Sequence, residues 1–89
     1  MTGPFKDEGA ARRAAHTALP PDPSRGILTS AENLQMLERV LGAAHVEAGA
    51  YDYRVLTWLS GYEDSTVAVI CGLVERAYAA GRAAGGGAR

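Results

Sequence analysis

Most of the large apolar side chains in this chain lie in one segment, residues 51–81, YDYRVLTWLSGYEDSTVAVICGLVERAYAAG. The rest of the sequence is dominated by alanine, glycine, arginine and proline. A folded domain needs apolar surface that can be removed from water, so any core has to be built around this segment. Its apolar residues recur at helical spacing, and the sequence therefore predicts an all-α fold without β-strands.

Gly61 divides the segment into two expected helices, at about residues 50–60 and 64–80. Glycine is the usual residue just past a helix end, because it enters the left-handed region without a Cβ penalty. The polar run at residues 63–66 then supplies side-chain oxygens for the unpaired N–H groups that open the next helix. Both helices are therefore predicted with definite boundaries.

A further helix is expected ahead of this segment, at residues 30–48. Thr29 and Glu32 have the spacing of a capping box, in which each side chain accepts a hydrogen bond from the other residue's backbone N–H. Gly49 is expected to end the helix. One apolar stripe runs along it, formed by Leu34, Leu37, Leu41, Ala44 and Ala48.

The two ends of the chain are expected to lie outside this domain. Residues 1–26 hold few large apolar side chains and finish in the proline-rich run PPDPSRG, which predicts an arm that is mostly disordered or a frayed helix, followed by a linker. Residues 82–89, RAAGGGAR, have no side chain that could anchor them, so disorder is expected. The predicted fold is thus all-α, a small three-helix domain at residues 27–81 with a flexible N-terminal arm and C-terminal tail.

The core of this domain is expected to consist of the large apolar residues of the three helices. Truncating one of them, as in Leu73→Ala, would then cost about 2–5 kcal/mol. The expected core residues are Leu37, Leu41, Trp58, Leu59, Ile70 and Leu73.

The last helix also carries a face of small residues, around Ala68 and Gly72. An interior glycine costs a helix about 0.5–1 kcal/mol relative to alanine, which suggests that another backbone comes close at this point. That backbone belongs either to another helix of the same chain or to a second copy. In the second case a symmetric homodimer would form, with Ala79 extending the strip and two tyrosines, Tyr62 and Tyr78, at its rim.

The sequence offers no arrangement of residues that catalysis, a metal ion or a cofactor would require. His16, His45 and Cys71 lack metal-ligand spacing, and the glycine run of the tail is not a phosphate-binding loop. Glu63 and Asp64 could form a carboxylate pair, but the start of a helix explains both. We therefore expect no enzymatic activity, no metal and no cofactor.

A single cysteine without a disulfide framework is typical of a protein from a reducing cytoplasm. Cys71 lies in the apolar helix, where a free cysteine usually behaves as a small buried hydrophobe. The sequence has no apolar run long enough for a membrane span and no apolar signal core at its N-terminus. A cytoplasmic location is therefore expected.

Two functions from different classes remain open. Nothing activates a nucleophile, and the apolar surface exceeds what three short helices need, which favours a protein-interaction module that binds a partner or itself. The alternative is a helix-turn-helix regulator, with Gly61 at the turn and Leu56, Val67 and Ile70 at its internal contacts. Residues 29–81 hold seven acidic and three basic side chains, a net charge of −4, so phosphate contacts would have to come from the basic arms.

Residues 29–81 also resemble short uncharacterised helical proteins of actinobacteria and their phages. The resemblance lies in an aspartate-arginine helix with a Trp-Leu end, followed by a helix rich in threonine, valine and alanine. It implies an accessory protein of a phage or mobile element. No activity is carried over with it.

Overall fold

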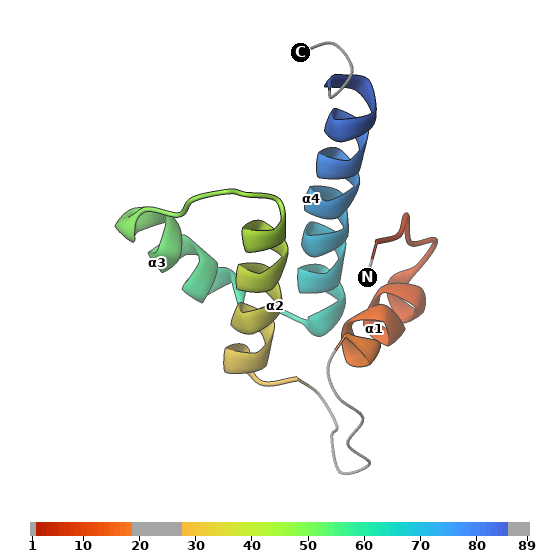
Figure 1. The fold of residues 1–89 in the computed structure, drawn as a ribbon. Coiled ribbons are helices and arrows are strands. Elements are labelled where there is room, and N and C mark those ends of the chain that lie inside the picture. Colours follow the sequence, from red (N-terminus) through yellow and green to blue (C-terminus); the bar gives the residue numbers. More distant parts are fainter. Residues whose placement is uncertain (1, 19–27, 86–89) are drawn as a thin grey trace.

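The computed structural model describes residues 2–18 and 28–85. Within them the chain forms four α-helices and no strand: α1 (Glu8–Thr17), α2 (Ser30–Ala43), α3 (Ala50–Leu59) and α4 (Asp64–Gly85). Figure 1 shows α2 between α3 and α4, with α1 beside the first turns of α4. The predicted all-α class is confirmed, and the predicted number of helices is corrected from three to four.

The additional helix, α1, belongs to the arm, for which the sequence predicts disorder or a frayed helix. Asp7 caps it, since its Oδ1 accepts the N–H of Ala10 at 2.8 Å. Ala11 and Ala15, one turn apart, are almost completely buried where α1 packs against α4. Small side chains let two helix backbones approach closely, so α1 folds without a large apolar residue. Residue 1 and residues 19–27, which include the whole proline-rich run, lie outside the described residues.

The start of α2 is the predicted capping box. Glu32 donates its N–H to Thr29 Oγ1 at 3.1 Å, and Thr29 donates its N–H to Glu32 Oε1 at 2.9 Å. Both partners lie within four residues, which explains why the sequence alone was sufficient to predict this boundary.

The end of α2 comes earlier than predicted, at Ala43 instead of residue 48. His45 adopts a left-handed conformation with φ of 59° and donates its N–H to the carbonyl of Gly42 at 3.1 Å. Val46 donates to the carbonyl of Leu41 at 2.9 Å. These two bonds form a Schellman motif, which ends a helix by satisfying its last carbonyls. A histidine thus takes the place usually held by glycine. The prediction that Gly49 ends this helix is therefore wrong.

Helices α3 and α4 begin close to the predicted residues. Gly49 precedes α3 and donates its N–H to Asp52 Oδ2 at 3.0 Å. Gly61 follows the end of α3, but Gly3 is the only glycine with positive φ among the described residues, so the expected left-handed turn is absent. At its other end α4 continues to Gly85, four residues into the expected tail, because alanine and arginine are strong helix formers. Residues 86–89 of the tail lie outside the described residues.

The core differs from the expected one in its residue types. Leu37 is buried, and Leu41, Leu59 and Ile70 are partly buried. Trp58 and Leu73, however, expose 63% and 53% of their surface, so their expected core positions are corrected. The buried apolar residues are Ala11, Ala15, Leu28, Met36, Leu37, Val40, Val67, Ala68 and Cys71.

Helix geometry explains the exposure of Leu73. It lies two residues after Cys71, which turns its side chain by about 200° around the helix axis. Cys71 is completely buried, so Leu73 points away from the core. None of the helices in the described ranges is both long enough and apolar enough to cross a lipid bilayer.

Candidate protein-interaction surface

Helix α3 contributes no buried residue to the fold, although it carries several of the largest apolar side chains. Tyr51, Val55 and Trp58 expose 73%, 42% and 63% of their surface. Their spacing of four and three residues places them on one side of the helix. Tyr62, 47% exposed, lies beyond the end of α3 with its ring edge-on to Trp58, at 4.9 Å between centroids. We call Tyr51, Val55, Trp58 and Tyr62 the α3 face.

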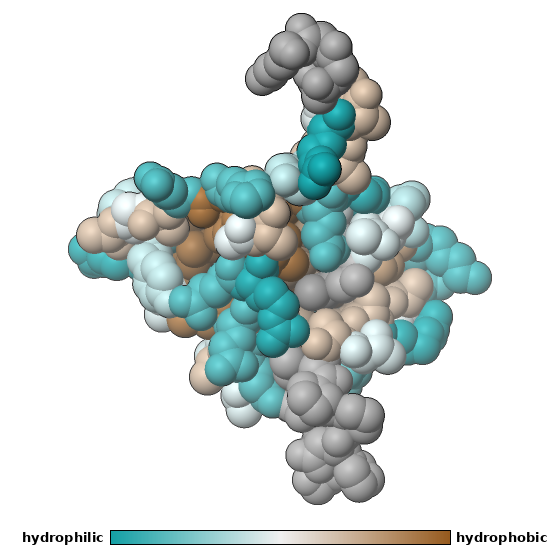
Figure 2. All heavy atoms as spheres, in the orientation of Figure 1, coloured by the Kyte–Doolittle hydropathy of each residue, from teal (hydrophilic) through white to brown (hydrophobic). Residues whose placement is uncertain are grey.

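A groove runs beside this face, between α3, the end of α2 and the loop that joins them. Its volume is about 360 Å³. Figure 2 shows apolar surface reaching the exterior in this part of the molecule. The residues that line the groove are Leu41, Val46, Glu47, Ala48, Tyr51, Asp52, Val55 and Leu56. We call it the α2–α3 groove.

The walls of the groove are positioned by hydrogen bonds. The Schellman motif places Val46 one residue after the left-handed turn, so that it lines the groove together with Leu41. On the other side of α3, the Tyr53 hydroxyl donates to the Glu38 carboxylate of α2. This bond ties α3 to α2 and is one reason why α3 keeps its place without buried residues.

A second cluster, a buried polar network, gathers at the start of α4, where Asp64 is only 5% exposed. Its Oδ2 accepts the N–H of Leu28 at 2.9 Å and lies 3.0 Å from His16 Nε2 of α1. Asn33 of α2 is 1% exposed and donates its Nδ2 to the carbonyl of Ser60 at 3.2 Å. The same Nδ2 lies 3.4 Å from the carbonyl of Tyr62 and from Asp64 Oδ1.

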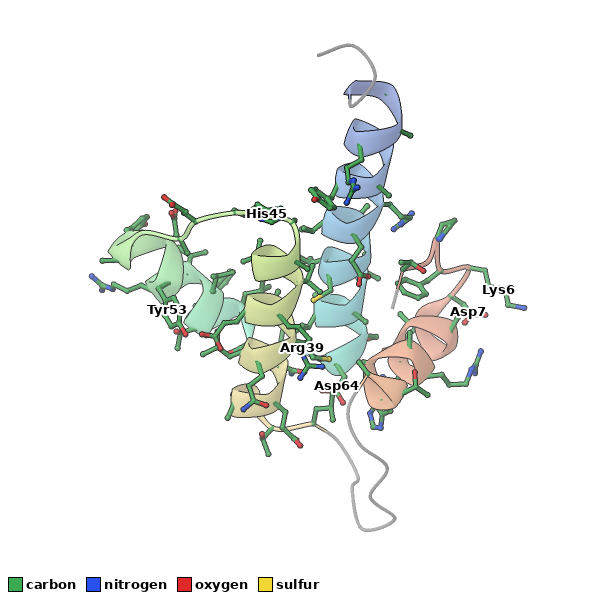
Figure 3. All side chains as sticks on the ribbon, in the orientation of Figure 1. Lys6, Asp7, Arg39, His45, Tyr53 and Asp64 are labelled. Atoms are coloured by element: carbon green, nitrogen blue, oxygen red, sulfur yellow. The ribbon has the colours of Figure 1, made fainter. Side chains whose placement is uncertain are left out.

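This buried network joins α1, α2, the end of α3 and the start of α4. Figure 3 shows Asp64 at the base of α4, on the side of α1. The Asp64 carboxylate and the Asn33 amide nitrogen bond to main-chain and side-chain groups of the fold, which indicates a structural role, whereas the buried Asn33 Oδ1 has no hydrogen-bond partner among the described residues. The two carboxylates considered as a catalytic pair lie in different environments. Asp64 is buried, whereas Glu63 is exposed and its carboxylate lies 3.7 Å from the guanidinium of Arg12.

The residues predicted for a self-association surface do not form one patch. Ala68 and Gly72 are buried within the single chain, so the fold itself accounts for their small side chains. Ala79 is exposed, and Tyr62 belongs to the α3 face. Tyr78 is half-buried and lies about 20 Å from the start of α4, measured along the helix axis. Its ring is 6.0 Å from that of His45 and 5.7 Å from the guanidinium of Arg82.

Of the candidate chemical groups, His16 and Asp64 lie together in the buried polar network, with His16 Nε2 3.0 Å from Asp64 Oδ2. Within residues 2–18 and 28–85, no group of three or more histidine, cysteine or acidic side chains could hold a metal ion. Cys71 is a buried free thiol, as predicted. Burial raises the pKa of the Cys71 thiol from 9.0 to about 11, with a smaller contribution from the negative charge of Glu75.

The first turn of α4 bears on the helix-turn-helix alternative. A recognition helix contacts bases with its N-terminal residues, which must therefore be accessible. In α4 the first two residues, Asp64 and Ser65, are buried. Of the three internal contacts expected for that motif, Val67 is buried, and Leu56 and Ile70 pack partly against the core.

Sequence reasoning missed the α3 face, although its signal was visible. Tyr51, Val55 and Trp58 have the spacing of one helix stripe, but Trp58 was assigned to the core because large apolar residues are usually buried. Comparison with protein-family models, curated proteins and solved structures gave no match to the chain. The resemblance to short actinobacterial and phage proteins therefore stays a prediction.

Proposed function

We propose that this chain is a small non-enzymatic protein-interaction module that binds a protein partner through the α3 face. The observation that carries the proposal is the exposure of Trp58 and Tyr51 on a helix with no buried residue. Tryptophan and tyrosine supply much of the binding energy in protein interfaces, because they bury large areas at a low entropic cost. Such a module would act in the cytoplasm, as an accessory protein of a phage or mobile element.

The helix-turn-helix regulator is the weaker proposal. The buried start of α4 and the net charge of −4 over residues 29–81 both oppose contact with phosphates. Titration of random duplex DNA at increasing salt separates the two functions. Binding at low salt that falls steeply with salt concentration would favour the regulator, whereas the interaction module binds no DNA at low salt.

The direct test is affinity capture of a partner by the wild type and by two single variants. Trp58→Ser removes the most prominent aromatic ring of the α3 face. Leu73→Ser removes an apolar side chain that is similarly exposed on α4, and serves as the matched control. We expect the partner to be lost with Trp58→Ser and retained with Leu73→Ser.

Binding by the purified partner is then measured directly. Trp58 is the only tryptophan in the chain, so its fluorescence emission reports contact with the α3 face. Transfer of an exposed indole into an interface shifts the emission to shorter wavelength. A partner that binds without any change in emission, and that Trp58→Ser still captures, would rule out this surface. Sedimentation of the chain alone shows whether the partner is a second copy.

A further inference from the structure

We propose that the α2–α3 groove receives one apolar side chain of a basic segment in the partner, with a lysine or arginine beside it. This inference rests on the proposed function, because the groove borders the α3 face and shares Tyr51 and Val55 with it. It adds the chemistry of the partner: an apolar anchor next to a positive charge.

The groove has an apolar interior. Leu41 and Leu56 are partly buried, and Val46 and Val55 are 49% and 42% exposed along its sides. A volume of about 360 Å³ accommodates one large side chain such as leucine or phenylalanine, but not a folded element. An anchor that enters removes both its own apolar surface and that of the groove from water, which drives association.

The charges that border the groove are both negative. Glu47 and Asp52 are among the residues that line it, and both are exposed. No hydrogen bond or ion pair engages the Glu47 carboxylate within the described ranges. A cation beside the anchor would therefore gain a charge partner, whereas an acidic segment or a nucleic acid would be repelled.

The groove is also preformed. The Gly49–Asp52 bond at the start of α3, the Schellman motif at the end of α2 and the Tyr53–Glu38 bond hold its walls. A site that needs little reorganisation loses less entropy when a ligand binds. A short peptide segment is thus a suitable ligand.

The experiment is a selection of random peptides, displayed on phage, against the full chain. We expect the selected peptides to combine leucine, isoleucine or phenylalanine with a lysine or arginine close by in the sequence. The affinity of one selected peptide is then measured by fluorescence anisotropy for the wild type and for Glu47→Lys, Glu63→Lys and Val55→Ser.

Glu47→Lys and Glu63→Lys change the net charge equally, but only Glu47 borders the groove. We expect Glu47→Lys to weaken binding about tenfold or more, as is usual for a charge pair at an interface, and Glu63→Lys to change it by less than about threefold. Val55→Ser, which removes an apolar wall, should also weaken binding. Circular dichroism of each variant shows whether the helices remain folded.

Three results would overturn the groove proposal: selected peptides without a cation, equal weakening by Glu47→Lys and Glu63→Lys, or no effect of Val55→Ser. Its failure can be distinguished from failure of the proposed function. If Trp58→Ser loses the partner while Glu47→Lys retains it, the α3 face binds the partner and the groove proposal is wrong. If both variants retain the partner, both proposals fall.

Discussion

Helices α1 and α3 both have ten residues, but the burial of each is the opposite of what its composition suggests. The α1 sequence, EGAARRAAHT, contains no large apolar residue, yet Ala11 and Ala15 are completely or almost completely buried. The α3 sequence, AYDYRVLTWL, contains six, and none is buried. The comparison teaches that burial depends on how closely a neighbouring backbone approaches, as well as on the size of the side chain.

The contacts around each helix explain the difference. Close approach of α1 to α4 brings polar groups into range at the edge of the contact, including His16 with Asp64 at 3.0 Å and Glu8 with Ser65 at 3.5 Å. Helix α3 packs against α2 through Leu56 and Leu59, which are only partly buried. Tyr51, Val55 and Trp58 on its other side are exposed and available to a partner.

The largest expected effect compares a buried with an exposed large side chain. Met36 is 1% exposed, and Met36→Ala should lower the free energy of unfolding by about 2–5 kcal/mol, because it leaves a cavity. Leu73→Ala should cost less than about 1 kcal/mol, since Leu73 is 53% exposed. Urea unfolding measures both. Equal losses would mean that Leu73 is covered in solution.

The next prediction tests the close contact of α1. Ala15 is 0% exposed, so Ala15→Leu would force α1 away from α4 and should cost about 1–3 kcal/mol. The same substitution at exposed Ala77 of α4 is the control and should be close to neutral. Thermal unfolding of both variants provides the measurement. If Ala15→Leu is as stable as the wild type, α1 does not pack tightly.

The pH dependence of stability tests whether water is excluded from the Cys71 thiol in the core. The folded chain holds the thiol protonated up to its raised pKa of about 11, whereas the unfolded chain ionises it near 9.0. Its contribution to stability is therefore fully present below pH 9 and is lost as the pH rises through 11. Relative to Cys71→Ala, the wild type should lose stability over this interval. Parallel pH profiles of the two proteins would show that the thiol is hydrated.

The smallest expected effect on stability concerns the α3 face. Trp58→Ala removes the largest side chain in the chain, yet it should change the free energy of unfolding by only about 0.5 kcal/mol, because the ring is 63% exposed. Chemical unfolding followed by circular dichroism avoids the lost fluorescence signal. A loss of several kcal/mol would place Trp58 in the core after all and remove the basis of the α3 face.

The sequence by itself determined the features that depend on neighbouring residues. The all-α class, the capping box of Thr29 and Glu32, and the break between α3 and α4 all follow from interactions within a few positions along the chain. The burial of Cys71 also followed, because the α4 segment around it is uncharged and apolar.

The tertiary structure decided which faces meet. Only the docking of α1 explains why its alanines are buried, and only the left-handed His45 explains the early end of α2. The exposure of Trp58 likewise depends on the absence of a described helix against that side of α3. The burial of the α1 alanines and the exposure of Trp58 depend on how segments far apart in the sequence pack, as in the contact of His16 with Asp64, which local pattern and propensity do not encode.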